Sequence, residues 1–287
     1  MITLDFAVAA WLFLLGAIFG SFMNVLILRY KPGESLFGKQ LLGRSKCPKC
    51  GKTLGPLELI PIFSFIFQAG KCRGCGKPIS IQYPIVEFLT GMAFASIPFF
   101  VTPWYAAAIW IAAASLMIVL SVIDLKHFVI PDMANALLVI LGAGYTALVA
   151  KGLIGATELV PGTFLGSYAY IFSFTANPII SHLLAAVALA SFFALIIILT
   201  KGKAMGWGDV KLAAGIGLLL GWPDGILAIA IAFVLGAIFG IVFLIRKKKT
   251  MKDALPFGPF ISAGAIITMM FGYEIISAYF RFLNLGA

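Results

Sequence analysis

Eight stretches of this chain are almost entirely apolar, and they restrict its fold more than any other feature. A membrane-spanning helix needs roughly 20 predominantly apolar residues, and most of the stretches come close to that length. The chain is 62% hydrophobic and only 11% charged, whereas soluble domains carry roughly 25% charged residues. We therefore predict an all-α polytopic membrane protein with about eight transmembrane helices. The predicted spans are 6–28, 83–101, 105–123, 133–150, 182–200, 210–221, 225–245 and 257–280.

Two of these spans need comment. The first has no basic segment before it, and the sequence GSFMN is a poor signal-peptidase site, so we expect a retained helix. The sixth, 210–221, is short. We expect it to begin nearer Met205, or to be tilted or broken.

The basic residues are distributed very unevenly between the two sides of these spans. With the N-terminus outside, nineteen of the 21 Lys and Arg residues fall in or just beside the inside segments 29–82, 124–132, 201–209 and 246–256. Only Lys151 and Arg281 fall outside them. Positive loops stay on the cytosolic side, so the pattern predicts that these segments are cytosolic. The net charge of +10 is then explained by topology and anionic lipid, and no nucleic-acid partner is required.

The first inside segment is much longer than the others, and it divides the chain. We predict that residues 1–82 comprise one helix and a cytosolic loop, and that residues 83–287 form a seven-helix membrane domain.

All four cysteines lie in this long loop, in the sequences CPKC and CRGC, each followed by glycine. Two CxxC pairs at such a spacing are typical of a zinc site with four thiolate ligands. Two disulfides are the alternative, but disulfides are rare in the cytosol. We therefore expect Cys47, Cys50, Cys72 and Cys75 to bind Zn²⁺. With all four positions filled by protein, the ion would be structural and would fold the loop.

Two aspartates stand at the inside ends of predicted spans. Asp124 ends the third span, and Asp209 opens the sixth within the sequence GWGD. Ionisable groups at membrane helices are functional candidates. Facing carboxylates share a proton, so that one can activate water while the other donates to a carbonyl oxygen. Gly206 and Gly208 would let a substrate strand approach closely.

Other interpretations of these acids remain open. Asp124 could pair with Lys126 at a helix end, and Asp209 could cap the sixth helix. The same two acids could also form a proton relay in a transporter, although the sequence shows no trace of an inverted repeat. Asp132, which follows Pro131, is expected to cap the fourth helix.

Six motifs in order resemble the bacterial type 4 prepilin peptidases, membrane aspartic proteases that carry a GxGD motif. They are GSFMNVLILRYKPGESL, RSKCPKCGKTLGPLELIPIFSF, GKCRGCGKPISIQYPIVEFLTG, DLKHFVIPD, GWGDVKLAAGIGLLLGW and LPFGPFISAGAI. The resemblance covers nearly the whole chain. A lone GxGD is weak, whereas six motifs with the cysteine loop among them are specific.

The resemblance implies an enzyme with two activities. The family cleaves the short basic leader of type IV prepilins and pseudopilins after a glycine, and then N-methylates the new N-terminus with S-adenosylmethionine. By motif position, Asp124 and Asp209 would be the catalytic pair, and the cysteine loop would belong to the methyltransferase part. The enzyme would lie in the bacterial inner membrane and act at its cytosolic face, with prepilins and the lipid bilayer as its partners.

The site for S-adenosylmethionine is not evident, because no Rossmann-type glycine motif follows a strand. Glu87 and Arg29, polar groups at helix ends beside the loop, are the candidates, with plain interfacial anchoring as the alternative. The loop has PLE where some family members carry tryptophan, which bears on methyl transfer more than on cleavage. A peptidase with purely structural zinc, and an intramembrane protease that cuts within helices, are further alternatives.

Overall fold

A computed structural model of the protein describes residues 6–38, 43–154, 177–246 and 255–282, and the predicted all-α architecture is confirmed there. The described elements are α1 (Phe6–Arg29), η2 (Pro56–Glu58), α2 (Phe63–Phe67), α3 (Gln82–Phe100), α4 (Trp104–His127), α5 (Asp132–Ala150), α7 (Pro178–Thr200), α8 (Trp207–Leu220), α9 (Asp224–Ile245) and α10 (Gly258–Phe282).

Among the described residues, seven helices are long and apolar enough to cross a membrane, and α8, with 14 residues, is the shorter eighth. The expected spans agree with these helices to within a few residues. The fifth helix begins earlier than predicted because the Asn177 side chain accepts a hydrogen bond from the Ile179 N–H, while Pro178 fills the first helical position. The sixth begins at Trp207, so Asp209 lies inside its first turn.

Helices α1 and α3 pack closely along their length through glycine contacts. A Cβ placed on Gly16 would lie 2.7 Å from the Thr90 carbonyl oxygen, and one on Gly20 would lie 2.8 Å from the Glu87 Cα. These two glycines are four residues apart on one helix face, which is the GxxxG spacing that lets membrane helices approach closely. The long first loop therefore leaves and re-enters the membrane domain beside a tightly joined helix pair.

Helices α5, α7 and α8 form a second closely packed group, and it supports the GxGD segment. Gly142 of α5 faces Leu218 of α8, and Gly217 of α8 faces the Ala186 backbone of α7, each without room for a Cβ. The Thr146 hydroxyl donates to the Leu218 carbonyl at 2.9 Å. A helix held in this way on two sides is fixed in register, and so is the aspartate at its start.

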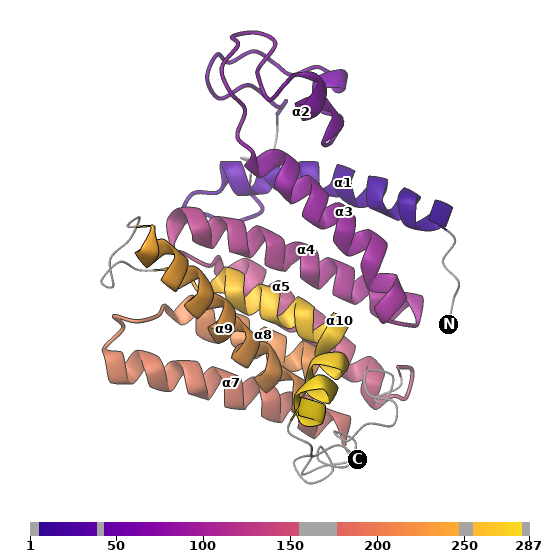
Figure 1. Ribbon diagram of the computed structural model, residues 1–287, viewed down its shortest axis with the longest axis vertical. Helices are drawn as coiled ribbons and strands as arrows, with labels where there is room; N and C mark the ends of the chain where they lie inside the picture. The colour runs from indigo at the N-terminus through magenta and orange to yellow at the C-terminus, as the bar shows by residue number, and fades with distance from the viewer. Residues whose placement is uncertain (1–5, 39–42, 155–176, 247–254, 283–287) are drawn as a thin grey trace.

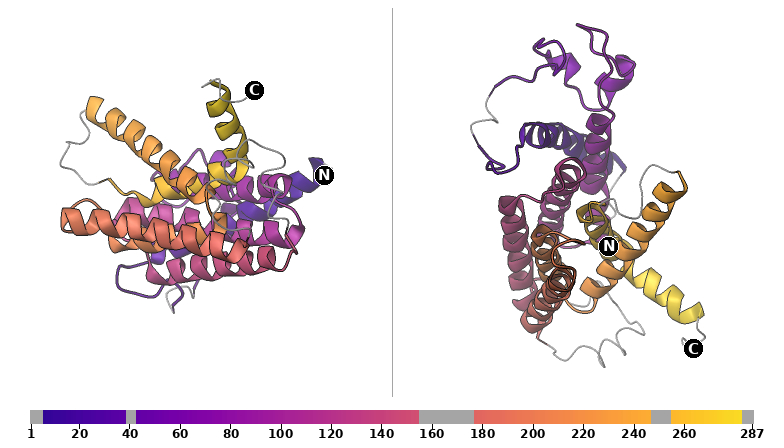
Figure 2. Two further views of the ribbon diagram at one scale, coloured as in Figure 1. Left: turned by 90° about the horizontal axis from the view of Figure 1, so that it is seen from below. Right: turned by 90° about the vertical axis from the view of Figure 1, so that its left-hand side faces the viewer.

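The long helices run across the molecule in Figure 1, with the α7–α8 and α9–α10 connections at the left end. The cysteine loop and α2 stand at one side, next to α1 and α3. Figure 2 shows, in the view from that left end, that this loop projects sideways from the helices. The described part of the protein is thus a helical bundle with one lateral appendage.

Candidate active site and cysteine site

Asp124 lies in the last turn of α4, as expected, and its contact crosses to another helix. Its carboxylate accepts a hydrogen bond at 3.0 Å from the Gly258 N–H, which opens α10. The residue is only 6% exposed. A Cβ on Gly258 would lie 2.8 Å from the carboxylate oxygen, so this contact requires glycine. The alternative pairing of Asp124 with Lys126 is not among the ion pairs of the described residues.

Asp209 occupies the third position of α8. Its Oδ2 accepts a hydrogen bond from the Gly206 N–H at 3.2 Å, so one oxygen does close the helix start. Its Oδ1 is buried and has no hydrogen-bond partner among the residues that the structure describes. Helix capping therefore accounts for half of this carboxylate and leaves a buried acceptor that a simple cap would not need.

Ile130 joins the two aspartate segments. A Cβ on Gly208 would lie 2.9 Å from the Ile130 Cβ, and one on Gly258 would lie 3.3 Å from its Cδ1. Gly208 and Gly258, the glycines next to the two aspartates, therefore both pack against the Ile130 side chain. The structure thus brings together the two aspartates that sequence reasoning paired.

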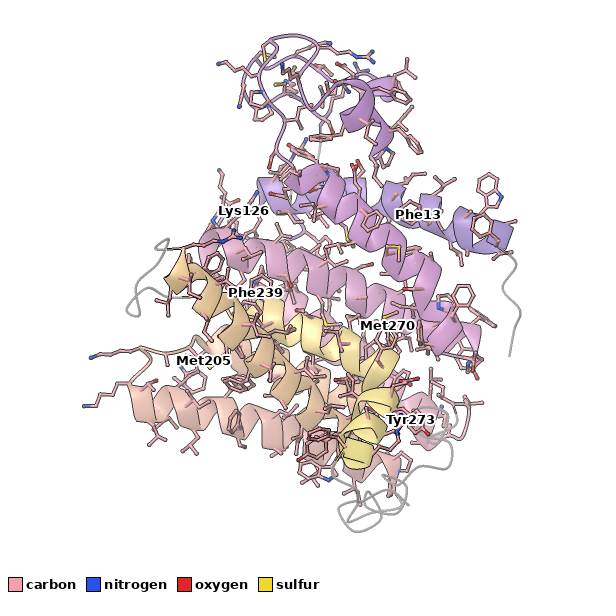
Figure 3. All side chains as sticks on the ribbon, viewed as in Figure 1. Phe13, Lys126, Met205, Phe239, Met270 and Tyr273 are labelled. Atoms are coloured by element: carbon pink, nitrogen blue, oxygen red, sulfur yellow. The ribbon has the colours of Figure 1, made fainter. Side chains whose placement is uncertain are left out.

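Figure 3 shows both segments at one end of the bundle. Lys126, two residues after Asp124, and Met205, just before the GxGD sequence, are labelled at the left end, whereas Met270 and Tyr273 lie toward the other end. The predicted common depth of the two aspartates agrees with this arrangement.

Three neighbours of the pair were not identified from the sequence: Gly258, Ile130 and Asn135. The Asn135 amide of α5 donates to the Gly208 carbonyl at 3.4 Å and so supports the GxGD backbone. Asp132 does not cap α5 as expected. It lies inside the first turn of that helix and forms a 2.6 Å ion pair with Lys211 of α8, which links the same two helices at the surface.

The four cysteines converge. Their Sγ atoms all lie within 4.8 Å of one another, and all four thiols are free of disulfides. Four thiolates at the usual zinc distance of about 2.3 Å in a tetrahedron would be about 3.8 Å apart. The site therefore fits the expected zinc ion and argues against two disulfides.

Two matching turns hold these thiols. The Cys47 N–H donates to the Lys52 carbonyl at 2.9 Å, and the Cys72 N–H donates to the Lys77 carbonyl at 3.0 Å. Each turn is completed by a glycine at positive φ, Gly51 at 75° and Gly76 at 66°. Backbone N–H groups of Lys49 and Cys50 lower the pKa of the Cys47 thiol, whereas burial and the neighbouring thiols raise the pKa of the Cys50 thiol.

Glu87 and Arg29 hold different parts of the loop. The buried Glu87 carboxylate accepts a hydrogen bond from the Ile62 N–H at 2.7 Å. The Arg29 guanidinium donates to the carbonyls of Gly43 and Arg44 at 3.4 and 3.3 Å. These contacts favour the anchoring interpretation for both residues, because their polar groups already serve the loop backbone.

A bundle of membrane-spanning helices with a buried carboxylate pair at one end and a four-thiol site beside it defines a class of polytopic membrane protein. Residues 14–101 match the family profile described as the bacterial peptidase A24 N-terminal domain, and residues 111–241 match the type IV leader peptidase family.

Curated proteins named prepilin leader peptidase/N-methyltransferase are similar over nearly their whole length. The protein from Bacillus subtilis strain 168 is 34% identical over 94% of this chain and 97% of its own length. Those from Xanthomonas campestris pv. campestris and Pseudomonas aeruginosa are 29% and 26% identical, over 94% of this chain and 94% and 92% of their own lengths. No solved structure matches. The chain belongs to the type IV leader peptidase family and is therefore an enzyme.

Proposed function

We propose that this protein is a prepilin leader peptidase whose catalytic groups are Asp124 and Asp209. The observation that carries the proposal is the buried Oδ1 of Asp209, which has no hydrogen-bond partner among the described residues. The Asp209 segment packs against Ile130, which also packs against Gly258, the hydrogen-bond partner of Asp124. The similar proteins carry this activity in their names. A buried acceptor without a partner is suited to a water molecule or a substrate group.

The chemistry follows from two carboxyl groups that share one proton. The ionised carboxylate removes a proton from water, whose oxygen attacks the scissile carbonyl carbon. The protonated partner gives its proton to the carbonyl oxygen. When the resulting diol collapses, the C–N bond breaks and the leaving nitrogen takes a proton from the carboxyl that first accepted it. One hydroxyl of the diol returns its proton to the other carboxylate, so that the pair again shares one proton. Cleavage after the leader releases the new N-terminal amine at the membrane.

We propose that cleavage takes place at the cytosolic face of the bacterial inner membrane. Lys126 lies at the end of the bundle that carries both aspartates. By the distribution of basic residues along the sequence, that end would be cytosolic. A prepilin has a basic leader and an apolar helix, so its scissile bond would lie at the same depth. The division of the chain at residue 82 stays a prediction.

The second proposed activity is methylation of the new N-terminal amine, with S-adenosylmethionine as the methyl donor. In the loop, Cys47, Cys50, Cys72 and Cys75 would hold a structural Zn²⁺ that fixes its fold. The contacts of Glu87 and Arg29 do not build a donor site, so no step of methyl transfer is assigned to them.

The decisive experiment is co-expression of the protein with a prepilin, followed by the intact mass of the product. Loss of the leader and gain of one methyl group by the wild type, with neither in Asp209→Asn, would support both activities. Leader loss without the methyl group would leave a peptidase with structural zinc. Uncleaved product from several prepilins would refute the proposal and favour the proton relay.

A further inference from the structure

The segment Leu57–Phe67, with the sequence LELIPIFSFIF, is the part of the cysteine loop that neither proposed activity explains. It joins the two cysteine pairs and contains η2 and α2. Its large apolar side chains are exposed, with Leu57 at 68%, Ile66 at 62% and Phe67 at 78%. Leu59, Ile60 and Phe63 add to the same exposed surface. Exposure of such an apolar surface to water is unfavourable, so the surface is expected to be covered by a binding partner.

The position of the segment along α1 and α3 indicates that this partner is the lipid bilayer. The Ile62 N–H is bonded to Glu87 of α3, and the Glu87 Cα packs on Gly20 of α1. Gly20 lies nine residues before the end of α1 at Arg29. At about 1.5 Å per residue, the attachment is about 13 Å inside the end of that helix. The loop therefore folds back beside the membrane-spanning pair, as Figure 1 shows for α2.

In an apolar environment every backbone N–H needs a protein partner, and several N–H groups around α2 have one. The Ser64, Ile66 and Gln68 N–H groups donate to the carbonyls four residues earlier. The Ile62 N–H cannot do so, because Ile62 forms a tight turn at φ +61° and ψ −54° in which the Phe63 N–H bonds back to Pro61. The Glu87 carboxylate supplies its missing acceptor.

The charges of the loop complete the argument. Glu58 is the only acid in the segment, and it is neutralised by Lys52 at 3.0 Å and by the Gly55 N–H at 3.0 Å. The Gly55 N–H, and to a lesser extent the Lys52 ammonium group, lower the pKa of the Glu58 carboxyl. Exposed cations surround the segment on both cysteine turns: Lys46, Lys49, Lys71, Arg73 and Lys77. Basic residues beside an apolar segment bind anionic lipid surfaces.

We propose that Leu57–Phe67 is an interfacial segment that inserts into the cytosolic leaflet of the bilayer. Its length of about 11 residues is too short to span and is typical of interfacial or re-entrant segments. The inserted segment would hold the cysteine site at the membrane surface. On the proposed function, that is the depth where cleavage creates the amine to be methylated.

A lipid photo-crosslink tests the insertion without any use of activity. A benzophenone amino acid replaces Phe67 in the full-length protein, which is reconstituted in nanodiscs of phosphatidylcholine and phosphatidylglycerol, illuminated and weighed intact. We expect an adduct of one phospholipid, as at the control position Phe22, a half-exposed residue of α1. An adduct with a second protein chain, or no adduct at 67 while 22 reacts, would overturn the proposal.

A second experiment tests whether insertion of the segment is needed for methyl transfer. Replacement of both Ile66 and Phe67 by serine should lower methyl transfer at least about fivefold and leave leader cleavage within about twofold, because the aspartate site is distant. Ile140→Ser, which removes an exposed apolar side chain from α5, is the matched control and should change neither. Equal methyl transfer in the double variant and wild type would contradict the positioning role. Absence of methyl transfer in the wild type would instead refute the proposed function and leave the lipid adduct standing.

Discussion

The two sites of this protein are built by different means. The aspartate site is assembled by helix packing, since α4, α8 and α10 each contribute one segment and Ile130 joins them. The cysteine site has few buried apolar residues, and two small turns bring its four thiols together. A packed bundle keeps its shape when one catalytic group is changed. A loop that depends on a metal loses its shape with one ligand. Substitutions at the aspartate site should therefore remove activity without unfolding, whereas substitutions at the cysteine site should unfold the loop.

The largest effect should follow from removal of one catalytic carboxylate. Asp124→Asn or Asp209→Asn should lower prepilin cleavage by about 10²- to 10⁴-fold or more, because one member of the acid–base pair is gone. Bound zinc and thermal stability should stay near wild type. Rates come from mass spectrometry of the cleaved pilin and zinc from elemental analysis, with Glu274→Gln on α10 as the control. Cleavage at wild-type rate would exclude the residue from catalysis.

Loss of one thiolate ligand should affect the cysteine site and leave the aspartate site unchanged. Cys47→Ser should release the zinc, expose the loop to proteases and abolish methyl transfer, because metal binding supplies the folding free energy of such a loop. Cleavage should stay within about threefold, since no hydrogen bond among the described residues joins the cysteine site to the aspartate site. Zinc content and limited proteolysis measure the change, with Ser45→Ala as the control. Retained zinc in the serine variant would contradict the proposed ligand set.

A crowding substitution tests how finely helix packing sets the aspartate site. The added methyl group in Gly258→Ala would lie 2.8 Å from the Asp124 carboxylate. It must displace that group, and a displacement of about 1 Å can cost about 100-fold in rate. Gly240→Ala in α9 is the control, because nothing lies within 4 Å of its added methyl group. Equal cleavage rates in the two variants would show that the Gly258 contact is dispensable.

A similar substitution at the α1–α3 pair should change stability more than chemistry. Gly20→Ala places a methyl group 2.8 Å from the Glu87 Cα, and overpacking of this kind costs about 1–3 kcal/mol. Gly144→Ala, whose added methyl group meets open space, is the matched control. Thermal unfolding in detergent measures both. An unchanged midpoint for Gly20→Ala would mean that the two helices can separate without cost.

The smallest effect is expected at the surface ion pair beside the aspartate site. Lys211→Gln removes the partner of Asp132, both half-exposed or more, so the free energy of unfolding should change by at most about 1 kcal/mol. Cleavage should be nearly unchanged. A large loss of cleavage with unchanged stability would assign Lys211 to substrate binding instead.

The membrane architecture could be predicted from the sequence because apolar length and basic loops act locally. The topology predicted that Asp124 and Asp209 lie at the same end of the bundle, whereas their pairing was implied by the resemblance. The sequence did not reveal Gly258 as the partner of Asp124, because that contact depends on how α10 crosses α4. It also placed the whole zinc-binding loop in the cytosol, with no contact to the membrane helices. The fold-back through Ile62 and Glu87 joins residues 25 positions apart, and neither hydropathy nor motif spacing indicates such a contact.

The short length of α8 affects how the protein adapts to bilayers of different thickness. With 14 residues it is about 21 Å long, less than a hydrocarbon core of about 30 Å. It can be this short because α5 and α7 pack against it and shield it from lipid. Its length therefore need not match the thickness of the hydrocarbon core. A thicker or thinner bilayer would tilt the outer helices first. We therefore expect a change in lipid composition to move the outer helices before it moves Asp209.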